Sequence, residues 1–522
     1  MREKLKMREK LKIFGLPIGI TLIFIAALFV HQLLLVKELP HQGWSRSLPF
    51  EESFKEKPQV FADAEDRIHI ASDGHVQTIK MNDKLAISEE TTTKTKITRG
   101  YPFWTDGKKY IYYKGGNLLL SSGGEEQILE KDITGLGTGK NDIFFWKDGT
   151  LSRYDTEKST SSEVHTFPSA IAGMYVADNG SAVVQVEKDN THDVLYYLDE
   201  KQNASGSFLT VASSPNKKMD GLTFKIKDGN LLVFYNEKSR SQGTLAYNVF
   251  KLQTPVEEIG NSMLEGEKVE FDLSDTGQKL MSPGGVQLME MEGEEMILLT
   301  SEGTKIGDNN TVSLYAAPLE DGTAFNAVPV STTKHVSYPP VKISDEAIVW
   351  VNYDGADYAL KGSSRNPEVI SESTNWSKSS VKEAINNGVL MMFSSLVTIM
   401  TSFYWVLPSL FLLILMYIFK PNAFEKDGIS WVEYLSIIIF IFMPVSYTQN
   451  AMNAYFEQMA PGYLLFPGSA YAVITFLTVI TLAIWKFGRD PDWGSMGGAF
   501  YFMGTYILLY ITFIGPYIFN LY

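Results

Sequence analysis

The sequence predicts a membrane protein that combines a large all-β extracytoplasmic domain with one plus four transmembrane helices. Its 522 residues exceed what one hydrophobic core usually organises, so we expect separate domains. Apolar segments long enough to cross a bilayer lie near the start of the chain and after residue 387. Residues 37–386, between them, contain many short β-branched and aromatic runs and little helical periodicity.

The first apolar segment, residues 13–36, contains no formally charged residue and follows the basic residues 1–12. Its length suffices to span a bilayer. The segment is longer than the apolar region of a signal peptide, and it runs into Lys37 without a small-residue cleavage site. We therefore expect an uncleaved anchor with a cytoplasmic basic N-terminus.

Residues 387–522 are predicted to form a four-helix transmembrane domain. The expected spans lie near 403–419, 429–449, 468–485 and 498–520. The two loops expected inside the cell carry Lys420, Lys426, Lys486 and Arg489, whereas the loop 450–467 carries no lysine or arginine. Because lysine and arginine concentrate in cytoplasmic loops, we predict five spans, with the large domain and the C-terminus outside the cell.

The apolar stretch 389–419 is too long for one helix perpendicular to the membrane. Its aromatic residues 403–405 are of the kind that lie at a membrane interface. In one interpretation residues 389–402 form an interfacial segment or a helix that projects toward the exported domain. In the other, the whole stretch is a single long tilted helix.

Turn-forming pairs recur through residues 37–386, and short hydrophobic runs flank them. The pairs are Asp73-Gly74, Asp106-Gly107, Asp148-Gly149, Asn179-Gly180, Asp228-Gly229, Asp275-Thr276-Gly277, Asp321-Gly322 and Asp354-Gly355. Asp-Gly readily adopts the positive φ angles of a tight hairpin. The mean spacing is about 40 residues, which is the range of β-propeller blades. We expect seven or eight blades.

Over residues 55–372 the chain resembles the broad class of β-propellers, including bacterial extracytoplasmic ones, in repeat length and strand pattern. For example, Ile143 to Trp146 and Leu151 to Tyr154 flank the Asp148-Gly149 turn. No tryptophan is followed by aspartate, so the combined Gly-His and Trp-Asp signature of WD40 repeats is not found. The resemblance implies that the first and last strands share a blade. A pair of β-sandwiches is the alternative.

Charge and cysteine content restrict the partners and the chemistry. The net charge is −14, and residues 37–386 hold 36 basic and 52 acidic residues, so the middle domain repels nucleic acid and no nucleic-acid partner is expected. The chain has no cysteine, which excludes disulfides, thiolate nucleophiles and cysteine zinc sites. This composition is compatible with a bacterial envelope, and we favour a Gram-positive cell.

No residue is assigned as catalytic, metal-binding or cofactor-binding. His69 and His75 could face each other across a hairpin, but solvated surface residues are the favoured interpretation. Residues 134–141 superficially match a phosphate-binding loop, yet they lack its first glycine and its final serine or threonine. We expect an ordinary loop between blades there. The nucleophile pattern Gly-x-Ser-x-Gly does not occur.

A polar group follows Pro444 at the outer end of the third predicted span. It comprises Tyr447, Thr448, Gln449, Asn450 and Asn453. One interpretation is a small outward-facing polar cavity for a ligand or lipid head group; the other is a helix end that enters a wet loop. Glu433, near the inner boundary, is expected to reach the cytoplasmic interface.

These observations predict a non-enzymatic, membrane-anchored extracytoplasmic binding or scaffold protein. The propeller would bind a protein or glycan partner, and the helical bundle, embedded in the lipid bilayer, would dock with another membrane protein. The alternative is a small transporter, or a transporter-accessory subunit, that handles an amphiphilic ligand in the bundle. A third hypothesis is a hydrolase whose acidic site lies at the propeller axis.

Overall fold

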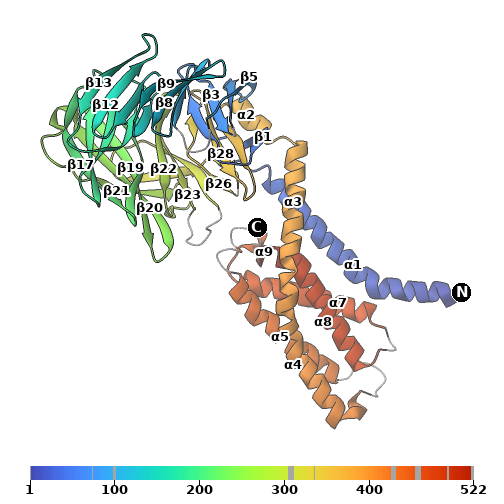
Figure 1. Ribbon diagram of the computed structural model, residues 1–522. Coiled ribbons are helices and arrows are strands. Elements are labelled where there is room, and N and C mark those ends of the chain that lie inside the picture. Colours follow the sequence, from blue (N-terminus) through green and yellow to red (C-terminus); the bar gives the residue numbers. More distant parts are fainter. Residues whose placement is uncertain are drawn as a thin grey trace. The chain divides into compact units, whose positions relative to one another are not determined.

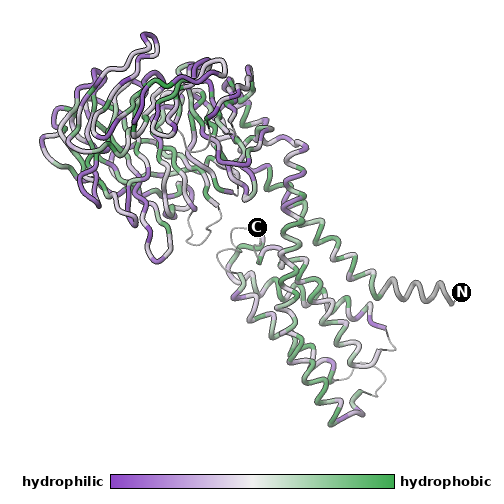
Figure 2. The backbone as a smooth tube through the Cα atoms, in the orientation of Figure 1, coloured by the Kyte–Doolittle hydropathy of each residue, from purple (hydrophilic) through white to green (hydrophobic). Residues whose placement is uncertain are grey.

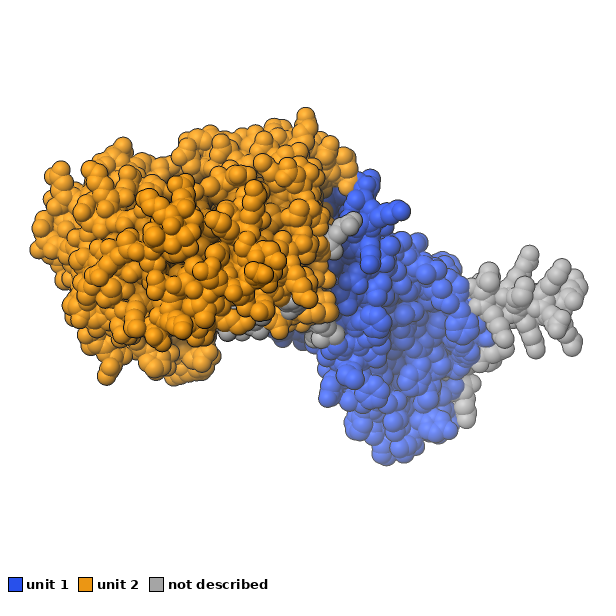
Figure 3. All heavy atoms as spheres, turned by 45° about the horizontal axis from the view of Figure 1, so that its top comes forward, with its two compact units in different colours: residues 1–38, 376–522 blue, residues 39–375 orange. Residues whose placement is uncertain are grey.

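The computed structural model describes residues 2–72, 74–97, 102–303, 311–333, 335–424, 431–452, 456, 460–490 and 493–518. The chain divides into two compact units (Figure 3). The β unit is Leu39–Asn375, and the helical unit is Met1–Glu38 together with Trp376–Tyr522. Each unit is described by itself.

The β unit is propeller-like (Figure 1). Its described strands form five hydrogen-bonded sheets, one of which has twelve strands, and consecutive antiparallel strands within them divide into seven blades. Blade one contains β2 (Gln59–Ala62), β3 (Ile68–Ser72), β4 (His75–Met81) and β5 (Ile87–Lys94). Blade two contains β6 (Phe103–Thr105), β7 (Lys109–Lys114), β8 (Asn117–Ser122) and β9 (Glu125–Lys131). Blade three contains β10 (Gly135–Thr138), β11 (Ile143–Lys147), β12 (Thr150–Asp155) and β13 (Thr160–Thr166).

Blades four to six are linked by pairing between β17 and β18 and between β21 and β25. Blade four contains β14 (Ile171–Val176), β15 (Ala182–Glu187), β16 (His192–Leu198) and β17 (Ala204–Ser214). Blade five contains β18 (Lys217–Lys227), β19 (Asn230–Ser241), β20 (Thr244–Pro255) and β21 (Glu267–Leu273). Blade six contains β22 (Gly284–Met291), β23 (Glu294–Ser301), β24 (Ser313–Pro318) and β25 (Ala324–Pro329).

The seventh blade joins the two ends of the β unit. It contains β26 (Val336–Ser337), β27 (Val341–Lys342), β28 (Ala347–Tyr353), β29 (Tyr358–Ser364) and the N-terminal strand β1 (Leu48–Phe54). Strand β1 runs antiparallel to β29, with Leu48 opposite Gly362. The backbone N–H of Ser45 also donates to the carbonyl of Ser364 (2.9 Å). The first and last strands therefore share one blade, as the resemblance implies.

The turn-forming pairs explain individual hairpins, but their number does not equal the number of blades. Asp228 (φ 49°) and Gly229 (φ 76°) form a two-residue loop between β18 and β19, as Asp-Gly predicts. Asp275-Thr276-Gly277 follows β21 of the same blade, so two of the eight predicted marks fall in one blade. Residues 135–138 form β10 rather than a loop, and Gly135 lies so close to the Trp146 ring that a Cβ would clash.

Burial follows the order of strands within a blade. The second strands, such as β11 and β28, are almost wholly buried, whereas the fourth strands β5, β9 and β13 are mostly exposed. Hydrophobic clusters such as that of Phe144, Val184 and Leu198 lie between neighbouring blades. The unit is therefore stabilised mainly by packing of one blade on the next.

Within its described residues the helical unit contains five helices that are long and apolar enough to cross a membrane, with residues 378–419 counted as one (Figure 2). Its helices are α1 (Arg2–Leu35), α3 (Lys378–Ser395), α4 (Val397–Phe419), α5 (Trp431–Ala451), α7 (Ser469–Gly488), α8 (Ser495–Phe513) and α9 (Gly515–Ile518), while α2 (Pro367–Ser373) belongs to the β unit. Only Leu396 separates α3 from α4, and its backbone is also helical, so residues 389–402 continue the helical path into α4.

Helix α8 forms the centre of the helical unit. It contacts α1, α4, α5 and α7, and the side chains of Phe502, Tyr506 and Leu509 are fully buried. Tyr501 Oη donates to the carbonyl oxygen of Ile13 in α1 (2.6 Å). The first helix is therefore packed with the C-terminal helices, although more than 340 residues separate it from them in the sequence.

Candidate functional site

The most extensive candidate site of the β unit is a set of three neighbouring cavities that we call the axial cavities. Their volumes are about 610, 430 and 370 Å³. The first strand of every blade contributes to their lining, and adjacent cavities share residues: Pro102, Lys57, Tyr338, Pro339 and Asp220. Residues from distant parts of the chain therefore converge here, as expected around a propeller axis.

Lysine and tyrosine side chains are paired on the wall of the 430 Å³ cavity. Lys57 Nζ lies 3.8 Å from the centre of the Tyr338 ring, and Lys238 Nζ lies 5.5 Å from the centre of the Tyr247 ring. A cation above an aromatic face is attracted by the ring quadrupole, which holds each ammonium group in place. The same cavity is lined by Glu302 and by hydroxyl groups, so it presents both charges and hydrogen-bonding groups to a ligand.

The 610 Å³ cavity is bordered by the first strands of blades three, four and five. Gln185 Nε2 donates to Asp193 Oδ2 (2.6 Å) in its wall. Burial raises the pKa of Tyr175 to about 12, and the nearby Asp220 carboxylate adds to the shift. Tyr175 is therefore a neutral hydrogen-bonding side chain at physiological pH.

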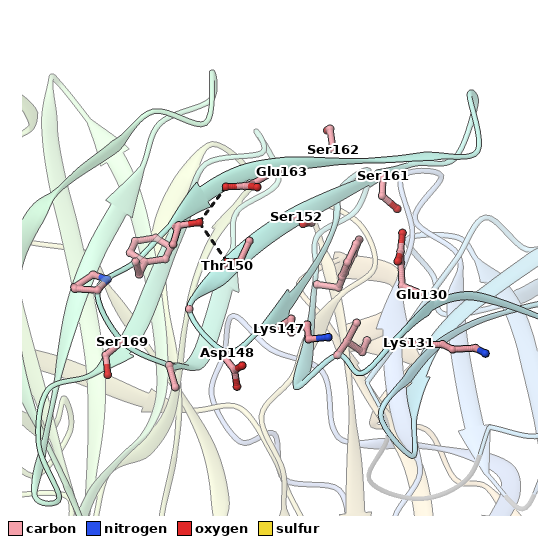
Figure 4. A pocket seen from close by; sticks show the side chains of 17 residues that line it. Glu130, Lys131, Lys147, Asp148, Thr150, Ser152, Ser161, Ser162, Glu163 and Ser169 are labelled. Carbon is pink, nitrogen blue, oxygen red and sulfur yellow. Dashed lines mark hydrogen bonds between the residues drawn. The ribbon is translucent and has the colours of Figure 1, made fainter.

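A separate groove of about 750 Å³ lies between β9 and the third blade (Figure 4). Hydroxyl groups from β12 and β13 line it, and Thr166 Oγ1 donates to Glu163 Oε1 (3.0 Å). Thr150 and Thr166 hydroxyls lie 3.3 Å apart. The groove is polar, but it draws on two adjacent blades only, whereas the axial cavities draw on all seven.

His69 is a buried structural residue rather than the solvated surface residue that we expected. Its Nε2 lies 2.9 Å from Asp63 Oδ2, and its Nδ1 lies 2.8 Å from Thr78 Oγ1. His69 and His75 do not face each other across the hairpin, because β3 and β4 place Thr78 opposite His69 and Ser72 opposite His75. The hydrogen bonds of His69 therefore join β3 to β4 and to Asp63, which directly follows β2.

The pKa values in this cluster follow from burial and hydrogen bonding. Burial is the largest cause that lowers the pKa of His69, Arg67 adds to it, and the pKa stays below its ordinary value although the adjacent Asp63 carboxylate raises it. For Asp63, burial acts to raise the pKa, but hydrogen bonds from His69 and Arg67 outweigh it and leave the pKa below the ordinary value. Arg67 Nε donates to Asp63 Oδ2 (2.7 Å). The folded state therefore favours neutral His69 beside ionised Asp63.

The predicted polar patch of the helical unit is split between two faces of α5. Thr448 is buried, and its hydroxyl lies 2.9 Å from Tyr510 Oη. Gln449 and Asn450 are exposed; Gln449 Nε2 donates to Tyr471 Oη (2.5 Å), and Asn450 bonds to the carbonyl of Ser446. Tyr447 packs against the Trp405 ring, and Asn453 lies outside the described residues. A shared cavity for these side chains stays a prediction.

A buried ion pair in the first turn of α5 was not predicted from the sequence. Glu433 was expected to reach the cytoplasmic interface, but its side chain is fully buried. Glu433 Oε2 lies 3.1 Å from Arg489 Nη1, and Glu433 Oε1 accepts a hydrogen bond from Trp485 Nε1 (3.1 Å). Gly498 of α8 makes room for the carboxylate, since a Cβ there would clash with it. Three helices thus meet around one carboxylate.

Comparison with known proteins gives structural similarity only. No protein-family model matches the chain, and no curated protein matches it. The chain is similar to the β-propeller domain of Cps50 (Swd1) from Myceliophteria thermophila, at 10% identity and a TM-score of 0.37, covering 60% of this chain and 98% of that one. It is similar to the WD40 domain of SCAP from fission yeast, at 6% identity and a TM-score of 0.33, covering 63% and 100%. A chain of the mitotic checkpoint complex has 10% identity and a TM-score of 0.36, covering 60% and 90%.

Proposed function

We propose that this protein is a membrane-anchored binding protein whose β unit recruits a protein partner at the axial cavities. The observation that carries the proposal is the convergence of all seven first strands on cavities lined by charged, hydroxyl and tyrosine side chains. Aromatic anchors surrounded by polar groups are typical of recognition sites. In this proposal the chain is a scaffold and not an enzyme.

The proposal places the helical unit in the lipid bilayer of a bacterial cell, with the Gram-positive envelope favoured. The five apolar helices and the lysines of the inner loops support this placement. The N-terminus is then cytoplasmic, and residues 37–386 and the C-terminus are outside. The exposed apolar side chains of α4, such as Met400 and Phe411, then contact lipid or a second membrane protein.

Site-specific photo-crosslinking of the full-length protein in its own membrane tests the proposal. A photoreactive amino acid replaces Ser282, which lines the 430 Å³ cavity, or Lys188, which is exposed on a loop of blade four. We expect a discrete heavier product from position 282 and none from position 188. Monomer alone at both positions, under conditions in which a known membrane complex is captured, contradicts the proposal.

A further inference from the structure

Two lysines lie directly opposite each other on the rim of the axial cavities. Strands β18 and β19 pair Lys218 with Lys238, and β19 and β20 pair Lys238 with Tyr247. Arg240 lies two residues beyond Lys238 and therefore projects from the same face of the blade. Like charges in directly opposed positions destabilise a sheet. The pairing of these two lysines therefore does not by itself stabilise the blade.

The composition of the β unit does not account for this cluster. Residues 37–386 hold 52 acidic and 36 basic residues, whereas this part of the blade brings three cations together with one carboxylate, Asp220, two residues from Lys218. Lys218 and Arg240 are exposed, and the Tyr247 ring positions Lys238. The backbone N–H of Arg240 donates to the carbonyl of Asn216 (2.8 Å), which ties the ends of the two hairpins together.

Two members of the cluster line the axial cavities, and Arg240 lies two residues beyond one of them on the exposed surface. Lys218 lines the 610 Å³ cavity, Lys238 lines the 430 Å³ cavity, and Asp220 lines both. A ligand bound in either cavity therefore lies beside one of these two lysines. An anionic group on that ligand relieves the repulsion between the lysines, so the energetic cost of the cluster in the free protein becomes affinity in the complex.

The mixed charge of the cavities identifies the class of ligand. Asp220 and Glu302 repel a chain of uniformly dense negative charge. A protein segment with spaced carboxylates avoids this repulsion, because its backbone N–H groups can donate to those acidic residues and to nearby hydroxyls such as Ser337. Its acidic side chains are then available to the cationic rim.

We propose that Lys218, Lys238 and Arg240 bind acidic side chains of a partner protein segment whose backbone enters the axial cavities. This inference rests on the proposed function and adds the chemistry of the partner. It assigns the three cations to recognition, and it explains why an acidic unit retains a like-charge pair.

Fluorescence anisotropy with a labelled synthetic peptide tests the assignment. The peptide carries aspartate at every second position between glycine and serine, and the comparison peptide carries asparagine instead. The full-length protein is held in nanodiscs of neutral lipid. We expect the aspartate peptide to bind at least about tenfold more tightly than the asparagine peptide.

Matched variants separate recognition from folding. Lys218→Gln and Arg240→Gln should each weaken binding of the aspartate peptide about tenfold, whereas Lys188→Gln, on an exposed loop, should leave it unchanged. The thermal midpoint of Lys218→Gln at low salt should be at or above that of the wild type, because the opposed lysine is gone. A lower midpoint would assign Lys218 to stability and would overturn its role here.

The remaining outcomes also decide the question. Equal binding of the two peptides, or normal binding by Lys218→Gln and Arg240→Gln, overturns the assignment. Inorganic polyphosphate that binds more tightly than the aspartate peptide, in a manner that depends on Lys218, shows a polyanion site instead of a peptide site. If any of these failures occurs while position 282 still gives a crosslinked product, the proposed function stands and only the assignment of the three cations is overturned. If position 282 gives no crosslinked product, both the proposed function and this assignment are overturned.

Discussion

Glu433 and Arg489 form an ion pair in which the carboxylate is fully buried and the guanidinium is nearly so, with a separation of 3.1 Å. Glu433 lies in the first turn of α5, and Arg489 directly follows the last turn of α7. Each charge is thus placed at the helix end whose dipole favours it. The pair joins the two helix ends, and Trp485 adds a hydrogen bond to the same carboxylate.

Removing one member of this pair should destabilise the helical unit more than removing both. Arg489→Met leaves a buried carboxylate without its cation and should cost about 3–5 kcal/mol. The double variant Glu433→Gln with Arg489→Met should recover most of that loss. Unfolding of the full-length protein in detergent, followed by tryptophan fluorescence, measures both. Lys486→Gln, an exposed change three residues away, is the control, and equal losses in the single and double variants would contradict the prediction.

Acid should weaken blade one through His69. Its pKa in the folded protein lies below the ordinary value, so the unfolded chain binds more protons once the pH falls below about 6.5. The stabilisation is complete above that pH and is lost as the pH falls toward the folded pKa. The lowered pKa of Asp63 extends the same trend to more acidic pH.

Chemical denaturation at pH 7 and pH 5 tests this dependence. The wild type should lose stability between the two values, and His69→Gln should flatten the change because it removes the titrating ring. His192→Gln, at an exposed histidine beside Asp189, should behave like the wild type. An unchanged slope in His69→Gln would assign the acid sensitivity to other groups.

Two glycines with almost the same backbone angle should respond differently to alanine. Gly243 has φ +86° with no atom near the position of a Cβ, so Gly243→Ala should cost about 1–2 kcal/mol from the left-handed conformation alone. Gly260 has φ +84°, and a Cβ there lies 2.5 Å from the backbone nitrogen of Gly206. Gly260→Ala should therefore cost about 1–3 kcal/mol more. Thermal unfolding compares them, and equal losses would exclude close backbone packing between these segments.

Single cysteines can map the topology, because the chain contains none of its own. Lys188→Cys in the β unit and Tyr463→Cys between α5 and α7 should react with a membrane-impermeant maleimide in intact cells. Asn422→Cys, between α4 and α5, should react only after permeabilisation. The cysteine-free wild type supplies the background. Reaction of Asn422→Cys alone in intact cells would invert the proposed orientation.

Local chemistry in the sequence predicted elements more reliably than their grouping. The strands around Asp148-Gly149 and the hairpin at Asp228-Gly229 follow from short-range turn preferences, and both predictions are confirmed. The blade count required knowing which turn starts each repeat. Asp106-Gly107 joins the first two strands of its blade, whereas Asp354-Gly355 joins β28 to β29, so the marks recur at the right spacing but at different positions.

The candidate site could not be predicted, because its residues meet only through the ring of blades. Lys57, Asp220 and Tyr338 have no common motif and are far apart in sequence, yet all line the 430 Å³ cavity. The burial of Glu433 was missed for a similar reason. Its partner Arg489 lies in a different loop, so hydropathy along α5 gave no signal of the pairing. Thr448 and Gln449 are adjacent in sequence, but the helical period places them on different faces of α5, one buried and one exposed.

The seventh blade determines how the protein would respond to mechanical force. The chain enters β1 at Leu48 and leaves β29 at Ser364, and antiparallel pairing places these two points at the same end of the strand pair. A force that pulls the segment before Leu48 away from the segment after Ser364, the two connections of the β unit, would break the hydrogen bonds one after another. The first to break would be those that join Ser45 to Ser363 and Ser364. Breaking hydrogen bonds one at a time requires less force than sliding one strand along another, which breaks them together. Pulling on both connections would therefore separate β1 from β29 first.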